Sequence, residues 1–201
     1  MMAQYFRMVK NIAEELEKNH KDCQALLDAL FELQKNERRL FIIGVGGSAA
    51  NASHAVSDFR KLCEIEAYNF DNLAELTART NDEGWESVFE KWLVGNNLEG
   101  SDMVMVFSVG GGNEEKKVSV NLINALKYAK FVGATTTGIV GRDGGYTKQV
   151  ADICVVIPTV NEYLITPFVE SFQAIIWHML VFHPSLNVNQ GRWESIAYDK
   201  K

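Results

Sequence analysis

Phe41-Ile-Ile-Gly-Val-Gly-Gly-Ser-Ala-Ala-Asn-Ala-Ser-His-Ala-Val-Ser-Asp58 is the stretch around which the rest of the chain is arranged. The short apolar, β-branched run from Leu40 to Ile43 predicts a buried strand. Glycines follow, and helical spacing begins at Ser48. A strand, a glycine turn and a helix N-terminus offer backbone N–H groups and a positive dipole end to an anion. His54 and Asp58, four residues apart, share one face of that helix, so this stretch predicts an active site.

Composition and charge exclude several classes of protein. The chain has 201 residues, 47% hydrophobic and 23% charged, which suits one domain with a sizeable core. A formal net charge of −6 argues against a nucleic-acid partner, because such proteins show a basic stripe. Nothing resembles a signal peptide, and no apolar run approaches the roughly 20 residues that span a bilayer. Cys23, Cys63 and Cys154 lack metal-type spacing and indicate buried thiols, so we expect a cytoplasmic protein without a membrane partner.

Predicted strands and helices alternate along the chain, which indicates an α/β three-layer sandwich around a parallel sheet. A second apolar strand, Met103–Phe107, runs into another glycine turn, Ser108–Asn113. Each turn alone could be a simple tight connection, but ligands collect at the carboxyl ends of such strands. The expected strands are 40–43, 65–68, 103–107, 135–140 and 153–157. The expected helices are 3–20, 22–36, 48–61, 72–79, 85–93, 114–128, a short one after 145, and 166–182.

The chain divides into three parts by pattern. We expect N-terminal helices in 1–36, an α/β domain in 37–185 and a tail in 186–201, for which the sequence indicates no function. The second N-terminal helix is apolar over a wide arc, which suggests burial against more than one neighbour. It can therefore pack on its own domain or form an arm in an oligomer interface, and the sequence leaves both open.

Four segments resemble the sugar isomerase (SIS) domain family, in its phosphoheptose isomerase branch. Gly44–His54 is similar to the run G-N-G-G-S-x-x-D-x-x-H, and Thr80–Gly84 is similar to the loop S/G-N-D-x-G. Ser108–Asn113 stands where S-T-S-G-N-S binds phosphate. Thr166–Glu170, followed eight residues later by His178, stands where T-P-R-I-Q leads to a functional histidine. The resemblance covers the chain to about residue 182 and implies a flavodoxin-like, five-stranded parallel sheet assembled as a homotetramer.

The same resemblance implies a reaction, the isomerisation of sedoheptulose 7-phosphate to D-glycero-D-manno-heptose 7-phosphate, which supplies surface-polysaccharide synthesis. By position it implies zinc, or another divalent metal, one per subunit, at His54, Asp58, Glu170 and His178. Asp58 would be the base and His178 its acid/base partner. Aldose–ketose interconversion needs such a pair and charge stabilisation for the enediolate. The predicted substrate-binding residues are Ser48, Asn51, Asp82, Ser108, Gly110, Gly111, Gly112 and Asn113.

Several positions depart from the family pattern. Asp58 replaces Glu, which draws the carboxylate back by one methylene, and Glu170 replaces Gln, which adds negative charge to the predicted metal site. Gly110 and Asn113 replace two of three phosphate-binding serines. The pair Lys116–Lys117 either supplies the missing contacts or consists of solvated surface charges.

Three interpretations of function follow. The leading one is a sugar-phosphate isomerase. The alternative is a non-catalytic SIS-domain protein that binds a sugar phosphate or docks on a DNA-replication initiator; it predicts loss of the acid/base pair, whereas Asp58 and His178 are present. The third is a sugar-phosphate-sensing regulator, but the chain lacks a helix-turn-helix extension. Arg142–Tyr146 resembles the G-K-D-G-G turn of the family and is interpreted as a supporting turn, and Trp177 is interpreted as a core or interface residue.

Overall fold

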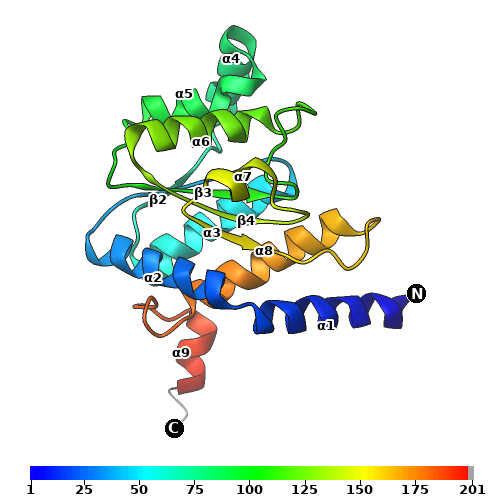
Figure 1. Ribbon diagram of the computed structural model, residues 1–201. Helices are drawn as coiled ribbons and strands as arrows, with labels where there is room; N and C mark the ends of the chain where they lie inside the picture. The colour runs from blue at the N-terminus through cyan, green and yellow to red at the C-terminus, as the bar shows by residue number, and fades with distance from the viewer. Residues whose placement is uncertain (199–201) are drawn as a thin grey trace.

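The computed structural model describes residues 1–198 and contains a five-stranded sheet between two layers of helices (Figure 1). The strand order is β2-β1-β3-β4-β5, and every neighbouring pair is parallel. The predicted fold class is therefore confirmed. The strands are β1 (Leu40–Gly44), β2 (Ala67–Asn69), β3 (Met103–Ser108), β4 (Thr135–Val140) and β5 (Ile153–Val156).

The helices surround the sheet in two groups that correspond to two apolar clusters. They are α1 (Met2–Lys18), α2 (Lys21–Lys35), α3 (Gly47–Cys63), α4 (Leu73–Glu83), η1 (Trp85–Ser87), α5 (Val88–Gly95), α6 (Val120–Val132), α7 (Gly145–Val150), α8 (Ile165–Val181) and α9 (Arg192–Tyr198). One face of the sheet is covered by α2, α3 and α8, and the other by α5 and α6 (Figure 1). The second N-terminal helix thus packs on its own domain, with Leu26 and Leu30 fully buried.

Strand β1, which lies inside the sheet between β2 and β3, shows why both layers of helices are needed. Leu40 and Ile42 point into the cluster formed with α2, α3 and α8, whereas Phe41 and Ile43 point into the cluster formed with α5 and α6. All four side chains are at most 1% exposed. Because successive side chains of a strand point to opposite faces, a continuous apolar run requires cover on both sides.

The chain reverses its direction of travel across the sheet between β1 and β3. Gly44, the last residue of β1, is paired with Phe107 near the end of β3. The two glycine turns therefore start side by side at the carboxyl edge of the sheet. In open α/β sheets this reversal point is where ligands bind.

Hydrogen bonds join α3 to α8 and fix their register. The Asn51 amide nitrogen donates to the Glu170 carbonyl oxygen at 2.8 Å and to Gln173 Oε1 at 3.0 Å. Gln173 is fully buried and donates in turn to the Ile139 carbonyl oxygen on β4. As a result the later turns of the two helices, which carry His54, Asp58 and His178, are held against each other.

The predicted start of one helix was wrong. The helix expected at 114–128 starts only at Val120, because the preceding residues form a closed turn. Asn113 and Val118 exchange two backbone hydrogen bonds of 2.9 Å, and Asn113 Oδ1 accepts the Lys116 N–H at 2.7 Å. Ser119 has a left-handed backbone with φ of 52°, which ends this turn just before the helix.

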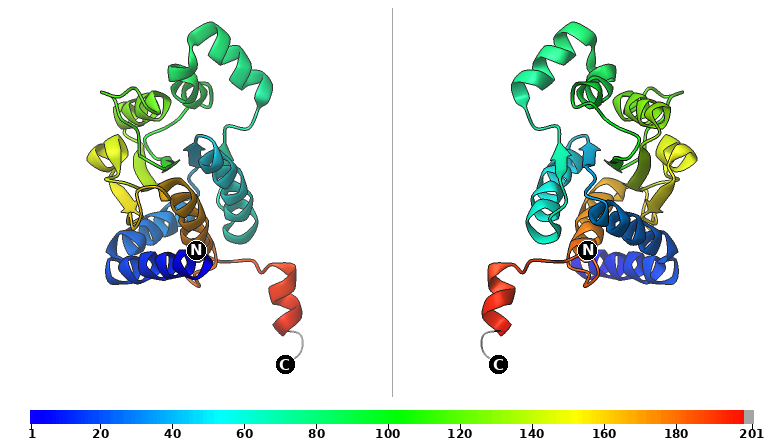
Figure 2. Two further views of the ribbon diagram at one scale, coloured as in Figure 1. Left: turned by 90° about the vertical axis from the view of Figure 1, so that its right-hand side faces the viewer. Right: turned by 90° about the vertical axis from the view of Figure 1, so that its left-hand side faces the viewer.

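Two further segments differ from their predicted extents. The helix expected at 72–79 continues to Glu83, since Arg79 pairs with Glu75 at 2.7 Å and with Glu83 at 3.4 Å, and it ends at Gly84. The tail contains α9, which projects away from the body, as α4 does at the opposite end (Figure 2). Among the described residues, no helix combines the length and the apolarity that a membrane span needs.

Candidate active site

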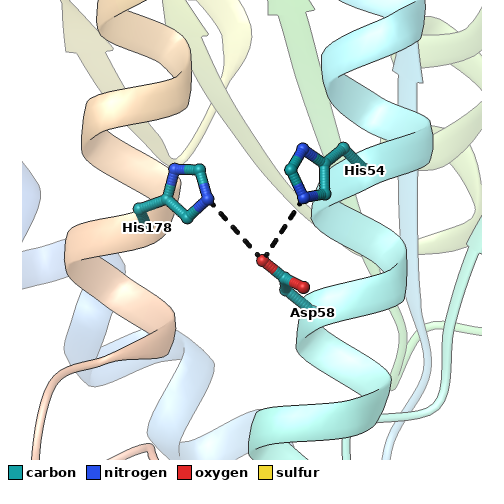
Figure 3. A group of neighbouring side chains, drawn as sticks. All are labelled: His54, Asp58 and His178. Atoms are coloured by element: carbon teal, nitrogen blue, oxygen red, sulfur yellow. Dashed lines mark ion pairs between the residues drawn. The ribbon is translucent and has the colours of Figure 1, made fainter. Parts of the chain in front are cut away.

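His54 and Asp58 lie one turn apart on α3, and His178 faces them from α8 (Figure 3). His54 Nε2 is 3.8 Å from Asp58 Oδ2, and His178 Nε2 is 3.7 Å from the same oxygen. The Asp58 side chain is only 18% exposed, whereas that of His54 is 61% exposed, so the group opens to the surface. We refer to these three residues as the His–Asp–His cluster.

The donor atoms of the His–Asp–His cluster fit a divalent metal ion. One nitrogen or oxygen from each residue lies within 4.8 Å of the other two. Zinc ligands of these types bind at about 2.0–2.2 Å, which separates two tetrahedral ligands by roughly 3.3–3.6 Å. His178 Nδ1 lies 2.8 Å from the Ala174 carbonyl oxygen, so the ring hydrogen belongs on Nδ1 and the Nε2 lone pair faces the cluster. Only a small closing movement separates this geometry from coordination.

The Trp177 ring packs against both imidazoles of the cluster. Its side chain is fully buried, and its ring centroid lies 3.5 Å from that of His178 and 4.7 Å from that of His54. Its indole nitrogen has no hydrogen-bond partner among residues 1–198. The indole therefore contributes shape and contact area to the cluster. No periodic signal in the sequence distinguishes Trp177 from an ordinary core residue.

Glu170, the fourth predicted metal ligand, does not belong to this group. Its carboxylate packs against Gly47, so closely that any side chain at position 47 would overlap it. This places the carboxylate at the first residue of α3, where the helix dipole favours negative charge. Within the described residues, the structure therefore brings together three of the four predicted ligands.

A cavity of about 810 Å³ lies at the carboxyl edge of the sheet, beyond the ends of the central strands. Four of the predicted substrate-binding residues line it: Ser108, Gly110, Gly112 and Asn113. Ser108 Oγ accepts the Gly111 N–H at 3.0 Å, so the hydroxyl hydrogen of Ser108 remains free to donate. We refer to this space as the glycine-turn cavity.

The floor of the glycine-turn cavity is built from two interlocked turns. Gly111, with φ of 69°, packs against the Gly144 carbonyl oxygen, and Gly145 packs against the carbonyl oxygens of Gly110 and Gly112. The backbone N–H groups of Tyr146 and Thr147 donate at 2.9 Å to the carbonyl oxygens of Gly112 and Gly111, respectively. No side chain would fit at either contact, so glycine is required there.

The remaining predicted substrate-binding residues lie elsewhere. Gly111 packs against Gly144 in the contact between the two interlocked turns. Asn51 uses both amide hydrogens to join α3 to α8. Ser48 is 1% exposed, and its hydroxyl has no partner among the described residues. Asp82 is exposed in the last turn of α4, where its carboxylate accepts a hydrogen bond from Asn81. Their binding roles stay predictions.

The cavity is also lined by Arg142 and Ser119, for which the sequence predicted no binding role. Of the two lysines that could supply phosphate contacts, Lys116 lines the cavity and Lys117 does not. Arg142 follows β4 after a single residue, so the rule that ligands gather at the carboxyl ends of parallel strands was the signal that could have identified it.

Comparisons with known proteins agree with this architecture. A family model described as the SIS domain matches residues 4–141. The phosphoheptose isomerase of Trichlorobacter lovleyi is 34% identical over 161 residues, which cover 77% of this chain and 76% of that protein. The solved structure of phosphoheptose isomerase GmhA from Neisseria gonorrhoeae superposes with a TM-score of 0.78 at 22% identity, covering 90% of this chain and 94% of that one.

A second relative is longer than this chain. The lincomycin biosynthesis protein LmbN of Streptomyces lincolnensis is 35% identical over 148 residues, which cover 68% of this chain. The match spans only about half of LmbN, 52% of its length.

The family model covers more than half of the present chain, and the isomerase of Trichlorobacter lovleyi is matched over three quarters of both proteins. The chain therefore belongs to the SIS domain family and, within it, to the phosphoheptose isomerase branch of sugar-phosphate isomerases.

Proposed function

We propose that this protein interconverts sedoheptulose 7-phosphate and D-glycero-D-manno-heptose 7-phosphate through an enediol, as a precursor step of surface-polysaccharide synthesis. The observation that carries the proposal is the convergence of His54, Asp58 and His178 from two helices that begin at the glycine-turn edge. Membership of the phosphoheptose isomerase branch supports the choice of substrate.

The proposed chemistry assigns one proton transfer to carbon and one to oxygen. Asp58 would take the proton from the carbon next to the carbonyl and return it to the neighbouring carbon. His178 would exchange a proton with the substrate oxygens through Nε2, since its Nδ1–H is held by the Ala174 carbonyl. A divalent ion, zinc in our proposal and one per subunit, would supply Lewis-acid polarisation of the carbonyl and hydroxyl oxygens when bound.

The glycine-turn cavity would hold the phosphate end of the substrate. His54 is seven residues into α3, about 10 Å from the first residue of the helix at roughly 1.5 Å per residue. A ligand that contacts both regions must therefore be extended, as an open-chain sugar phosphate is. Glu170 lies along this path at Gly47 and would join a metal ion only by leaving the first turn of α3.

The direct test is turnover of sedoheptulose 7-phosphate by the zinc-loaded protein. We expect Asp58→Asn and His178→Ala to lower kcat by at least about 100-fold, because general acid–base groups contribute about 10²- to 10⁴-fold. His183→Ala is the matched control, because His183 is exposed, lies outside the cluster and is hydrogen-bonded only to Ser185 among the described side chains. Loss in both cluster variants with full activity in the control supports the proposal.

His178 Nε2 cannot bind a metal ion and transfer protons at the same time. Measuring the metal content of the variants distinguishes these two roles. If His178 binds the ion, His178→Ala should lose metal; if it moves protons, the variant should keep metal and lose kcat. Glu170→Gln should retain metal, because its carboxylate lies outside the cluster. Removal of the ion with a chelator should abolish turnover. Bound metal in every subunit without turnover of this substrate would contradict the proposal.

A further inference from the structure

We propose that Arg142 is the main phosphate-binding residue of the glycine-turn cavity and makes the protein specific for a doubly ionised sugar phosphate. The inference rests on the proposed function and extends it to one side chain. The turn Ser108–Asn113 offers a single serine hydroxyl, whereas the resembling family pattern has three serines. Ser119 adds a second hydroxyl to the cavity, but a cationic donor binds phosphate more strongly than a neutral one, and Arg142 has the position and the charge to do so.

The Arg142 side chain packs against Gly110. Arg142 Cδ and Nε lie 3.4 Å and 3.9 Å from the place that a Cβ of residue 110 would occupy. The arginine side chain thus lies over the glycine, in the region where the family pattern carries a serine. Arg142 has a left-handed backbone, with φ of 54°, which is costly for a residue other than glycine and directs this side chain to the cavity wall.

The charge of Arg142 is available to a ligand. Among the side chains that the structure describes, no carboxylate oxygen lies within 4 Å of the Arg142 guanidinium or of the Lys116 ammonium. By contrast, Arg39 pairs with Asp102 at 2.6 Å and Arg79 pairs with Glu75. The neighbouring Asp143 uses its carboxylate to accept the Gly145 N–H at 3.1 Å. The cavity therefore presents two cations that form no ion pair with a described side chain, together with the free hydroxyl hydrogen of Ser108; the carboxylates of Asp143 and Glu162 also line it.

Arginine suits this task better than lysine does. Its planar guanidinium offers donors in a fork that matches two phosphate oxygens at once, whereas a lysine ammonium acts as a point charge. A phosphate monoester loses its second proton near pH 6, so two cations favour the dianion over the monoanion. We therefore expect the cavity to select phosphorylated sugars over neutral ones.

The experiment compares Arg142→Gln and Arg142→Lys with a matched control, Lys117→Gln. Lys117 carries the same charge and a similar left-handed backbone, with φ of 52°, but lies outside the cavity. Binding of inorganic phosphate to the full-length protein is measured by calorimetry, and KM and kcat are measured with sedoheptulose 7-phosphate. For Arg142→Gln we expect phosphate affinity to fall about 10- to 100-fold, the cost of a charge-assisted hydrogen-bonding partner.

The same variant should raise KM by a similar factor and change kcat by less than about twofold, because uniform binding is lost. Arg142→Lys should recover part of the affinity, and Lys117→Gln should match the wild type. Equal phosphate binding by Arg142→Gln and the wild type would overturn the proposal, as would the absence of any phosphate binding by the wild type. In a further outcome, Arg142→Gln binds phosphate more weakly than the wild type, while neither the wild type nor any variant turns over sedoheptulose 7-phosphate. That outcome would reject the isomerase function and still support Arg142 as the anion-binding residue.

Discussion

Trp177 is the residue whose role can be tested most sharply outside the His–Asp–His cluster, because it contacts both imidazoles and no solvent. We expect Trp177→Leu to lower kcat about 10- to 100-fold, since small misplacement of catalytic groups is costly. KM should change by less than about twofold, because the glycine-turn cavity does not include Trp177. Steady-state kinetics on protein shown to be folded by circular dichroism provides the measurement.

Two further variants show whether the loss of kcat is due to the missing ring beside the histidines. Trp177→Phe keeps an aromatic ring and should restore most of the activity. Trp85→Leu removes a tryptophan that is 44% exposed and should leave the kinetics unchanged. A Trp177→Leu protein with normal kcat would show that the indole fills the core and does not position the histidines.

At this scale the sequence predicted part of the site. The four-residue spacing of His54 and Asp58 was enough to place them on one face of a helix. The approach of His178 depends on the packing of α8 on α3, which no local pattern encodes, and there the family resemblance was needed. Arg142 was missed because a charged residue in a turn follows no hydrophobic period, and its exposure to a cavity is a tertiary property.

Between elements, Asp152 links the start of β5 to β4 and α6. Its carboxylate accepts the Thr136 N–H at 2.8 Å, the Thr136 hydroxyl at 2.9 Å and the Lys130 ammonium at 2.6 Å. Burial alone would raise the pKa of Asp152, but the hydrogen bonds from Lys130 and Thr136 outweigh it and hold the pKa below its ordinary value. The ionised carboxylate therefore stabilises the folded state.

This pKa direction predicts how stability depends on pH. A carboxyl group with a lowered pKa stabilises fully above its unfolded pKa, about 3.9, and that contribution is lost as the pH falls through the lower folded value. We expect Asp152→Asn to reduce the free energy of unfolding by about 1 kcal/mol at pH 7, a modest figure because the side chain is 45% exposed. Urea unfolding at pH 7 and near pH 3 should show the difference shrinking in acid. An equal difference at both pH values would contradict it.

Helices and strands were predictable from the sequence where their pattern of apolar residues is clear. The run Leu40–Ile43 identified β1 because both faces of the strand are buried. The start of α6 was misplaced because the Asn113 side chain closes a turn with Lys116, and such side-chain bonds compete locally with the helix. For α4, the ion pairs of Arg79 extend the helix beyond the point where polar residues suggested a break.

For the molecule as a whole, the projecting helices leave apolar side chains uncovered. No residue of α4 is buried, although this helix has only 11 residues and isolated helices of that length are marginal in water. Apolar side chains stand exposed on α1 and on the two projecting helices: Phe6 at 70%, Leu73 at 71% and Trp193 at 83%. We propose that copies of this chain cover these surfaces in a homotetramer.

Native mass spectrometry should therefore give a species of four times the 22.6 kDa mass of one chain. Leu73→Glu should shift the population toward smaller species, because the charge would be buried in the interface. Lys35→Gln on α2 is the control, because it changes the charge by the same amount at a side chain that is 63% exposed. A monomer at micromolar concentration, with α4 amides exchanging as rapidly as an unfolded peptide, would contradict the assembly.

The interlocked turns that form the floor of the cavity also limit how the protein can be re-engineered. Because Gly111 packs on Gly144, and Gly145 on Gly110 and Gly112, neither loop has a shape independent of the other. A chimaera that imports one loop from a relative would pair two backbones that never evolved together. Retargeting this scaffold by loop grafting should therefore succeed only when both turns come from one donor, and recombination breakpoints between residues 113 and 141 should be selected against.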